Sequence, residues 1–487
     1  MLLLLFAVAV MLVGLCAHMF SERKGLTSEH LFPPLVKSFI PLGLDNILML
    51  IRLSIENTHF YFFKRHFENY GQTFALRVGV ANLYFTNDPE NIKALLSTQF
   101  GEFGKGPLFH ETLKEFLGHG IFNVDHELWQ TSRTLLRPQF VKERISDLEL
   151  FERHFQQLLL HIPNDKTVDL LDLFMRMTLD SATEYLMGVS TNSLADPKVK
   201  FAEAFDFVQD LSARRVILGP LYQLYPTFGY SKAIRTLDHF VEPFIDRAIG
   251  LHHSNSEKPS SNYIFLDAIS ELTQDRKVLR DQILNILLAG RDTTAAALSW
   301  AFYEMARHED VWRKLQEEVA ILNGAKPTFD DLKSIKYLQW IINETLRLYP
   351  SVPGNVRTAL VDTTLPRGGG PKGDEPIFCK KGTPVGYIVQ VMHTRTDFYG
   401  PDALEFKPER WSGPPPKPWS YLPFNGGPRI CLGQQFAIAE MGYIIVRMAQ
   451  TFETLEQQDF KERVMRKTII LTSGNGVKVS LCRKSGP

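Results

Sequence analysis

One cysteine lies in a turn that suits a metal-binding or reactive sulfur. Residues 424–433 read Phe-Asn-Gly-Gly-Pro-Arg-Ile-Cys-Leu-Gly, and helical periodicity follows over residues 434–450. Backbone amides and the positive end of a helix dipole at that place stabilise a thiolate, and glycines let the backbone approach a flat cofactor without a Cβ clash. Taken alone, the loop around Cys431 is also compatible with a buried cysteine beside an ordinary glycine turn.

A small polar group interrupts a predicted helix that is otherwise apolar. Residues 277–308 have helical periodicity, and Gly290, Asp292 and Thr293 lie in the middle of this segment. Glycine weakens a helix, and a threonine hydroxyl can bond to the carbonyl one turn earlier. Both residues would therefore loosen this turn and open a groove. The alternative is a helix kinked by glycine and threonine, with Asp292 at the surface.

Two further pairs of residues have the spacing of one helix face. Glu344 and Arg347 are three apart in a helix predicted over residues 334–349, and Trp129 and Arg133 are four apart. Residues at these spacings are neighbours on a helix surface, so each pair can act together on one partner. Such pairs are also common on solvated faces, and neither identifies a function alone.

Together, and in this chain order, the motifs resemble those of the cytochrome P450 family. The resemblance rests on Phe424…Gly427-x-Arg429-x-Cys431-x-Gly433, Ala289-Gly290-x-Asp292-Thr293, Glu344-x-x-Arg347 and Pro408-Glu409-Arg410-Trp411. It extends over nearly the whole chain. It implies a mainly α fold with small β-sheets, in which a single haem domain follows an N-terminal transmembrane helix. It also implies haem b as the cofactor, with Cys431 as the axial ligand of the iron.

The resemblance also assigns roles to other residues. An indole N–H and three arginines would hold the haem propionates, and the cofactor-binding set is Trp129, Arg133, Arg357, Phe424, Gly427, Arg429 and Gly433. Arg410 would join Glu344 and Arg347 in a buried structural triad that holds the cysteine loop. Asp292 and Thr293 would be catalytic, because an acid and an alcohol can relay protons to dioxygen.

One branch of the family is especially similar. Residues 289–294, 364–370 and 424–435 look like the fungal microsomal alkane and fatty-acid hydroxylases and their relatives in secondary metabolism. This branch implies a monooxygenase that inserts one oxygen atom of O2 into a long-chain alkane, a fatty acid or a lipophilic metabolite such as a polyketide. Electrons would come from NADPH through a separate NADPH–cytochrome P450 reductase.

Two alternatives from other classes remain. One is a haem-thiolate isomerase or dehydratase that does not use O2, although such enzymes tend to lose the acid and alcohol that Asp292 and Thr293 supply. The other is a membrane-tethered haem-binding protein without catalysis. It would need neither the oxygen groove nor the arginines for propionates.

The composition argues against several other classes of protein. Lys+Arg and Asp+Glu both count 54, so there is no basic field to hold nucleic acid. The four cysteines are scattered without a Cys-x-x-Cys pair, which favours a reducing compartment over a disulfide framework or a zinc finger. Gly368–Gly370 lie in an irregular, proline-containing stretch rather than between a strand and a helix, so we expect no nicotinamide or flavin site.

The N-terminus predicts a membrane anchor. Leu2 to Phe20 carry no formal charge if His18 is neutral, and 19 residues at ~1.5 Å each just span a hydrocarbon core of ~30 Å. Arg23 and Lys24 follow, so the positive-inside rule places the rest of the chain in the cytosol. We expect a single-pass protein of the endoplasmic reticulum membrane whose catalytic domain faces the cytosol. A cleaved signal peptide is the alternative, but its usual basic first segment is missing.

The remaining pattern predicts one folded unit. The expected plan is a transmembrane anchor over residues 1–20, a proline-containing hinge over 21–45 and a haem-thiolate monooxygenase domain over 46–487. Helices are expected over residues 169–188, 277–308, 334–349 and 434–450, and strands over 74–84 and 385–392.

Overall fold

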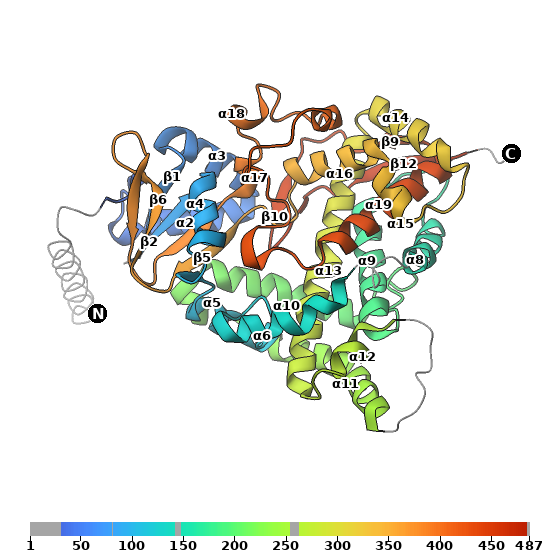
Figure 1. Ribbon diagram of the computed structural model, residues 1–487, viewed down its shortest axis with the longest axis horizontal. Coiled ribbons are helices and arrows are strands. Elements are labelled where there is room, and N and C mark those ends of the chain that lie inside the picture. The colour runs from blue at the N-terminus through green and yellow to red at the C-terminus, as the bar shows by residue number, and fades with distance from the viewer. Residues whose placement is uncertain (1–30, 80, 142–147, 254–262, 485–487) are drawn as a thin grey trace.

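Helices make up most of the molecule; the strands of the larger sheet gather at one side of it, and a small sheet lies toward the opposite side, near the C-terminus (Figure 1). The computed structural model describes residues 31–79, 81–141, 148–253 and 263–484. The predicted mainly helical class with small sheets is confirmed over these ranges. The predicted anchor and residues 21–30 of the predicted hinge lie outside them. Within the described part of the chain, none of the helices has the length and apolar character needed to cross a membrane.

The α-helices differ widely in length. In chain order they are α2 (Leu44–Glu56), α3 (His59–Tyr70), α4 (Pro89–Lys93), α5 (Pro107–Leu117), α6 (His126–Leu136), α8 (Glu149–Leu159), α9 (Leu170–Met187), α10 (Lys200–Ile217), α11 (Tyr230–His253), α12 (Phe265–Ser270), α13 (Arg276–Met305), α14 (Glu309–Val319), α15 (Phe329–Ser334), α16 (Lys336–Leu348), α17 (Val389–Met392), α18 (Thr396–Tyr399) and α19 (Gln434–Thr451).

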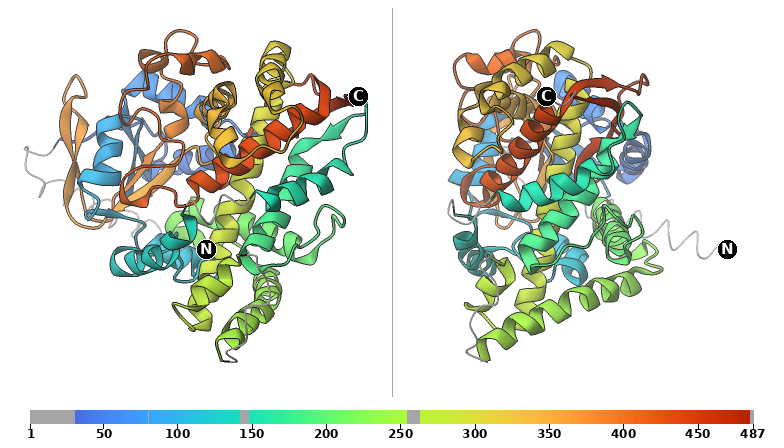
Figure 2. Two further views of the ribbon diagram at one scale, coloured as in Figure 1. Left: turned by 45° about the vertical axis from the view of Figure 1, so that its right-hand side comes forward. Right: turned by 90° about the vertical axis from the view of Figure 1, so that its right-hand side faces the viewer.

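The long helix α13 runs through the middle of the molecule, and α19 crosses it (Figure 2). Asp275 caps α13 by accepting hydrogen bonds from the amides of Lys277 and Val278, at 2.8 and 3.1 Å. Most of its residues are buried on all sides, as expected of a helix that other helices enclose. Helix α9 packs along it, with the rings of Phe174 and Phe302 5.3 Å apart. The helix predicted over residues 277–308 is confirmed.

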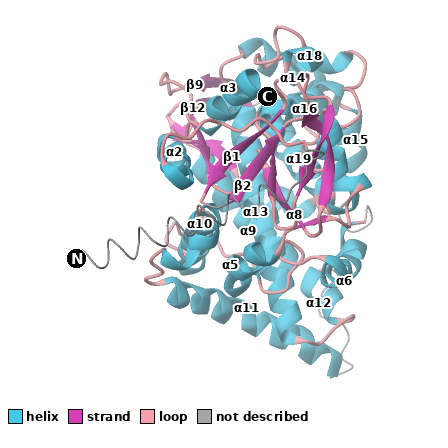
Figure 3. Cartoon of the chain, turned by 90° about the vertical axis from the view of Figure 1, so that its left-hand side faces the viewer, coloured by secondary structure: helices cyan, strands magenta, loops and turns pink. Residues whose placement is uncertain are grey.

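The strands form one larger sheet and three small ones, seen from the strand-rich side in Figure 3. The larger sheet has the order β1 (Thr73–Val78), β2 (Ala81–Thr86), β8 (Pro384–Tyr387), β5 (Asn355–Ala359) and β3 (Phe103–Gly104), with β2 and β8 parallel. The small sheets pair β6 (Thr363–Gly369) with β7 (Glu375–Cys379), β10 (Met465–Lys467) with β11 (Leu471–Ser473), and β12 (Lys478–Arg483) with β4 (Val168–Asp169) and β9 (Phe452–Gln457).

Three segments differ from the sequence-based expectation. The strand predicted over residues 74–84 is a hairpin, β1 and β2, and Gly79 has the positive φ of 63° that its reversal requires. The strand predicted over residues 385–392 ends at Tyr387 and continues as α17. Gly368 and Gly369 lie in β6, because residues 363–369 pair with β7 instead of forming an irregular loop.

Part of the predicted hinge pairs with the sheets. The Val36 amide donates to the Ala75 carbonyl at 2.9 Å, the Ala75 amide donates to the Pro34 carbonyl at 2.8 Å, and the Phe378 amide donates to the Leu31 carbonyl at 2.9 Å. Residues 31–36 are therefore fastened to β1 and β7.

Candidate active site

Cys431 lies in a tight turn just before α19. Its amide donates to the Phe424 carbonyl at 3.0 Å, which closes the loop, and Gly433 occupies the N-cap of α19. Gly427 has a φ of 64°, and a Cβ there would lie 1.8 Å from the Leu96 carbonyl oxygen. Glycine is required at this position by the packing of the loop against the turn that holds Leu96.

The Cys431 thiol is exposed to a cavity of about 480 Å³. The residues that line it are Trp129, Arg133, Arg137, Phe140, Val141, Gly427, Pro428, Ile430, Cys431 and Leu432. Burial by the surrounding protein raises the pKa of the thiol, while the Gly433 amide and the Arg133 charge lower it. The last two groups favour the thiolate, which is the form that binds a metal.

Positive side chains surround the loop on the side of α6. The Arg133 guanidinium donates to the Ile430 carbonyl at 3.1 Å. The Arg429 guanidinium donates to Asp125 Oδ1 at 2.7 Å and lies 4.7 Å from the Trp129 ring, but its buried Nε has no hydrogen-bond partner. The structure thus brings the predicted Trp129, Arg133 and Arg429 together.

A lysine that the sequence analysis missed completes this cluster. Lys105 Nζ donates to Asn355 Oδ1 at 3.2 Å. Burial holds the pKa of Lys105 well below its ordinary value, and the nearby charges of Arg357 and Arg429 lower it further. Burial and Arg357 also lower the pKa of Arg429, to about 10. Among the groups that shift these two pKa values, Asp125 is the only carboxylate.

This imbalance of charge tests whether the site fits a dianionic cofactor. Lys105, Arg357 and Arg429 are close together, and a single nearby carboxylate leaves an excess of positive charge. Buried charges are normally paired, so an acidic ligand is expected here. The two propionates of a haem supply that charge, and the orphaned Arg429 Nε supplies a donor. The residues present fit a haem.

The predicted triad assembles around Glu344, which is fully buried. Arg347 donates from Nε and Nη2 to the two Glu344 carboxylate oxygens at 2.8 Å each, and Arg410 Nε donates at 3.4 Å. The Trp411 indole and the Lys407 amide donate to the same carboxylate at 3.0 Å. Glu344 is therefore satisfied by two cations and two neutral donors.

His393 links the triad to the cysteine loop. Arg347 Nη1 donates to the His393 carbonyl at 2.9 Å, and the Leu422 amide donates to His393 Nε2 at 2.8 Å. Leu422 lies two residues before Phe424, whose carbonyl closes the loop on Cys431. Burial lowers the pKa of His393 to about 3, so the ring is neutral and Nε2 can accept. His393, which the sequence analysis did not assign to the site, therefore connects the predicted triad to the cysteine loop.

The turn around Thr293 is open in the middle of α13. Thr293 Oγ1 donates to the Ala289 carbonyl at 2.6 Å, which is the bond one turn back that the sequence predicts. The side chains of Leu288, Ala289 and Thr293 are partly accessible, whereas the residues before and after this turn are buried. The Ser351 hydroxyl also donates to the Thr293 carbonyl at 2.8 Å.

Asp292 points away from that opening and into the protein. It is 3% exposed, and Arg291 Nε lies 3.4 Å from its Oδ1. Burial raises the pKa of Asp292, while Arg291 and Gln209 oppose the rise. The alternative that placed Asp292 at the surface is wrong, because α10, which carries Gln209, packs over this side of α13.

The helix that follows Cys431 is tied to the turn of Thr293. Glu440 on α19 is 1% exposed and accepts a hydrogen bond from Ser181 Oγ of α9 at 2.6 Å. Burial raises its pKa to about 7, while Ser181 and the Thr294 hydroxyl lower it. Glu440 therefore connects α9, α13 and α19 at the residue next to Thr293.

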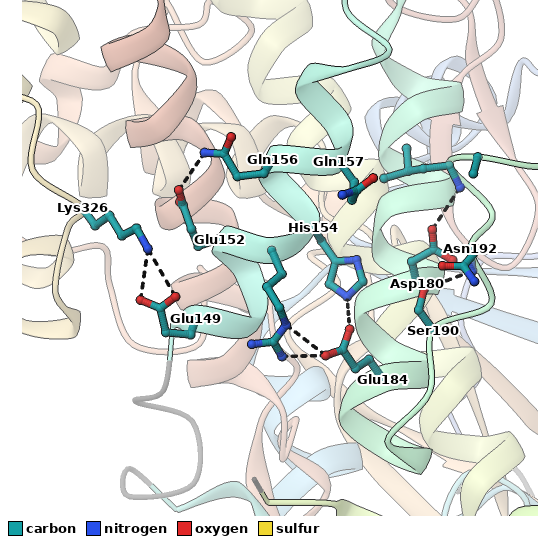
Figure 4. A pocket seen from close by; sticks show the side chains of 13 residues that line it. Glu149, Glu152, His154, Gln156, Gln157, Asp180, Glu184, Ser190, Asn192 and Lys326 are labelled. Atoms are coloured by element: carbon teal, nitrogen blue, oxygen red, sulfur yellow. Dashed lines mark hydrogen bonds and ion pairs between the residues drawn. The ribbon is translucent and has the colours of Figure 1, made fainter. Parts of the chain in front are cut away.

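A second, polar cavity of about 610 Å³ contains none of the predicted residues (Figure 4). His154 Nε2 and Arg153 Nη2 contact Glu184 at 2.8 and 2.6 Å, and Lys326 contacts Glu149 at 3.3 Å. These ion pairs match Arg153 with Glu184 and Lys326 with Glu149 in the lining of the cavity.

Comparison with known proteins agrees with this geometry. The family model described as Cytochrome P450 matches residues 41–480. The chain is 42% identical over 495 residues to the cytochrome P450 monooxygenase himC of Aspergillus japonicus, covering 98% of this chain and 88% of that protein. It is 45% identical to cytochrome P450 52A9 of Candida maltosa (79% and 78% covered) and 39% identical to the cytochrome P450 monooxygenase pvhE of Talaromyces variabilis (91% and 89%).

Proposed function

Because this chain belongs to the cytochrome P450 family and is a haem-dependent monooxygenase, we propose that it hydroxylates a long-chain or similarly lipophilic substrate. The substrate classes are a long-chain alkane, a fatty acid or a secondary metabolite such as a polyketide. Electrons would come from NADPH through a separate reductase. The relatives himC and pvhE are named as cytochrome P450 monooxygenases, which supports the class of reaction.

The observation that carries the proposal is an exposed cysteine thiol next to a cluster of cations. Lys105, Arg357 and Arg429 outnumber the one carboxylate, Asp125, that shifts their pKa values. Cys431 would be the axial ligand of the iron, and Trp129, Arg133, Arg357 and Arg429 would hold the propionates. When bound, the haem supplies dioxygen binding and O–O cleavage, which an electron-rich thiolate favours. Phe424, Gly427 and Gly433 would shape the loop around the sulfur.

Lys105 would be a fifth contact to the propionates. Burial lowers its pKa, and a carboxylate beside it would stabilise the charged form. No sequence motif includes Lys105, because Arg357 and Arg429, which lie near it in the fold, are far from it in the sequence.

Asp292 and Thr293 would deliver protons to the oxygen side of the groove. The Thr293 hydroxyl lies at the accessible turn, where it can hold a water or pass a proton from its Oγ1. Asp292 lies behind it, and burial raises its pKa toward the range where a carboxyl group is an effective donor. A rotation of the Asp292 side chain would be needed for direct transfer.

Two measurements test the proposal. The reduced protein with carbon monoxide should show the red-shifted Soret band of a thiolate-ligated haem, and Cys431→Ser should lose it. Labelled dioxygen should then place one heavy oxygen atom in a hydroxylated apolar product. A Soret shift with no label in any product would favour the isomerase or dehydratase alternative, and a chain that binds haem without turnover would favour the non-enzyme.

The surface supports a membrane location. Helix α2 exposes Leu44, Leu48, Ile51 and Ile55, at 48, 63, 37 and 75%, and their spacing places them on one face. A one-sided apolar helix suits the interface of a bilayer. We propose that the protein lies in the endoplasmic reticulum membrane, which residues 1–20 would span. Residues 21–45 would connect this anchor to the domain over residues 46–487. That domain would face the cytosol, with α2 against the lipid.

The reductase would approach from the side of the cysteine loop. We propose that the exposed Lys407 and Lys417 add positive charge to this surface; Lys407 pairs with Asp402 at 3.0 Å. The Arg429 side chain is 8% exposed and bonded to Asp125, so it contributes to the cofactor site and not to this surface.

A further inference from the structure

Two histidine side chains meet where α5 is followed by the loop that leads to α6. His110 lies on α5 and His119 lies in the loop, and the centroids of their rings are 5.1 Å apart with the ring planes at 59°. An imidazole bound to zinc at ~2.0–2.1 Å has its ring centre roughly 3.2 Å from the metal, so two such rings at a tetrahedral angle have centres about 5.2 Å apart. The observed separation therefore matches two imidazoles that share one zinc ion.

A hydrogen bond to the backbone prepares His110 to bind a metal. Its Nδ1 lies 2.8 Å from the Asn123 carbonyl oxygen, and because a carbonyl only accepts, the proton of the neutral ring lies on Nδ1. Nε2 then carries a lone pair, and no described residue forms a hydrogen bond with it. Histidines that bind metals commonly donate their other N–H to a backbone carbonyl in this way. His119 is exposed, and its ring is likewise without a hydrogen bond to any described residue.

Two glycines hold the backbone on either side of His119 against α13. Gly118 has a φ of 53°, and a Cβ there would lie 2.0 Å from Asp281 Oδ2. A Cβ at Gly120 would lie 1.9 Å from Asn285 Nδ2. The His119 amide itself donates to Asp281 Oδ2 at 2.8 Å. The backbone that carries His119 is therefore fixed by α13, so the fold itself sets the pairing of the two histidines.

A buried oxygen without a partner lies in the same loop. Asn123 is fully buried, and its Nδ2 donates to the His110 carbonyl at 3.2 Å and to the Gly118 carbonyl at 2.9 Å. These two bonds fix the orientation of the amide group, so Oδ1 is an acceptor, and no described residue donates to it. A buried acceptor without a donor is costly, so a further group is expected beside it. A water bound to a metal ion would supply the missing donor.

We propose that His110 and His119 bind a zinc ion that fastens the loop over residues 118–123 to α5, with Asn123 Oδ1 accepting from one of its waters. Imidazole nitrogens select zinc over Mg²⁺ and Ca²⁺, and the tetrahedral angle favours zinc over Cu²⁺. The described residues contain no group of three or more histidine, cysteine and acidic side chains that could hold a metal, so waters complete the coordination. Because α13 holds the same loop, bound zinc would stabilise the folded arrangement of α5, the loop and α13.

Calorimetric titration of the untagged holoenzyme with Zn²⁺ tests the site. The native protein should bind zinc, and His119→Gln should weaken binding by at least about tenfold, since even the groups that orient a metal ligand contribute about 10–100-fold. His110→Gln should weaken it similarly. His161→Gln is the matched control, because it removes another exposed histidine, in the turn after α8, and should keep the native affinity. Mg²⁺ should not bind at this pair, because it prefers oxygen ligands.

Two further readouts separate zinc binding from damage to the fold. X-ray absorption at the zinc edge should show two imidazole ligands with oxygen in the remaining positions, and zinc should slow amide hydrogen exchange over residues 118–123 in the native protein but not in His119→Gln. An unchanged haem Soret band in His119→Gln shows that this variant is folded. No zinc binding by the native protein, an all-oxygen zinc shell, or equal affinities in the native protein and His119→Gln would overturn the site and leave the monooxygenase proposal standing.

Discussion

At the scale of single residues, the two predicted catalytic side chains have different surroundings. Thr293 lies at the accessible turn of α13, whereas Asp292 is buried against Arg291. In the proposed proton delivery, the Thr293 hydroxyl would meet the substrate side, and the Asp292 carboxyl group would supply it from behind after rotating toward it. This order assigns the larger role in proton delivery to Thr293.

Replacing Thr293 should separate oxygen consumption from product formation. In Thr293→Ala we expect about a 100-fold loss of hydroxylated product, the usual contribution of one positioned acid or base, with continued NADPH oxidation and released peroxide. The ratio of product to NADPH consumed measures this. Thr293→Ser keeps the hydroxyl and should retain most coupling; an unchanged ratio in the alanine variant would contradict the role.

Lys105 offers a test of the cofactor site that does not depend on turnover. Lys105→Met removes one of the unmatched cations, and we expect haem to dissociate roughly tenfold faster, since a hydrogen bond to a charged group contributes about 1.5–3 kcal/mol. Transfer of haem to an excess of apomyoglobin gives the rate. Lys114→Met is the control, because the Lys114 side chain is 51% exposed and pairs with Glu111. Equal rates in both variants would exclude Lys105 from the site.

At the scale of elements, a chain of contacts positions the cysteine loop. Glu344 and Arg347 lie on α16, Arg347 holds the His393 carbonyl, and His393 accepts from Leu422 at the start of the loop. The loop has little regular structure of its own. Its shape therefore depends on a buried ion cluster that belongs to another element.

Removing the centre of this cluster should cost the protein its haem. Glu344→Ala leaves Arg347 buried without its carboxylate, at a cost of about 3–5 kcal/mol, and we expect a folded fraction that lacks the thiolate-type Soret band. The absorbance ratio of haem to protein measures the loss. Glu317→Ala on α14 removes an ion pair whose partners are both 62% exposed and should keep the full ratio. A normal haem content in Glu344→Ala would contradict the positioning role.

Elements with a strong local signal were predictable, and those set by distant contacts were not. The helix expected over residues 277–308 is α13, because its apolar run and its Asp275 cap lie in one segment. The strand expected over residues 74–84 turns back at Gly79, and β propensity alone does not show a reversal. Lys105 was missed for a similar reason, since only folding brings Arg357 and Arg429 beside it.

At the scale of the whole molecule, one buried carboxyl group joins three of the helices that enclose the site. Glu440 on α19 accepts from Ser181 of α9 and interacts with the Thr294 hydroxyl of α13. No cation is among the causes of its pKa shift, so burial dominates and raises the pKa to about 7. The protonated form is therefore the one that the fold prefers.

This preference predicts how stability depends on pH. The pKa of Glu440 rises from an ordinary 4.5 to about 7 on folding. The contribution of Glu440 to the free energy of unfolding is therefore fully present below about pH 4.5 and is lost as the pH rises to 7. The loss amounts to roughly 3 kcal/mol. Glu440→Gln cannot ionise and can still accept from Ser181. We therefore expect it to match the native protein at pH 5 and to unfold at a higher temperature at pH 8.

The comparison of Glu440→Gln with the native protein needs a control variant that removes a carboxylate elsewhere and leaves the contact between α9, α13 and α19 unchanged. Glu453→Gln on β9 removes an exposed carboxylate and should follow the native pH dependence. Thermal unfolding of the three proteins, followed by circular dichroism at a series of pH values, gives the curves. If Glu440→Gln and Glu453→Gln lose stability in parallel between pH 5 and 8, the carboxyl group at the α9–α13–α19 junction is ionised in the folded protein. The packing of the three helices must then hold a charge that the described residues leave without a cation.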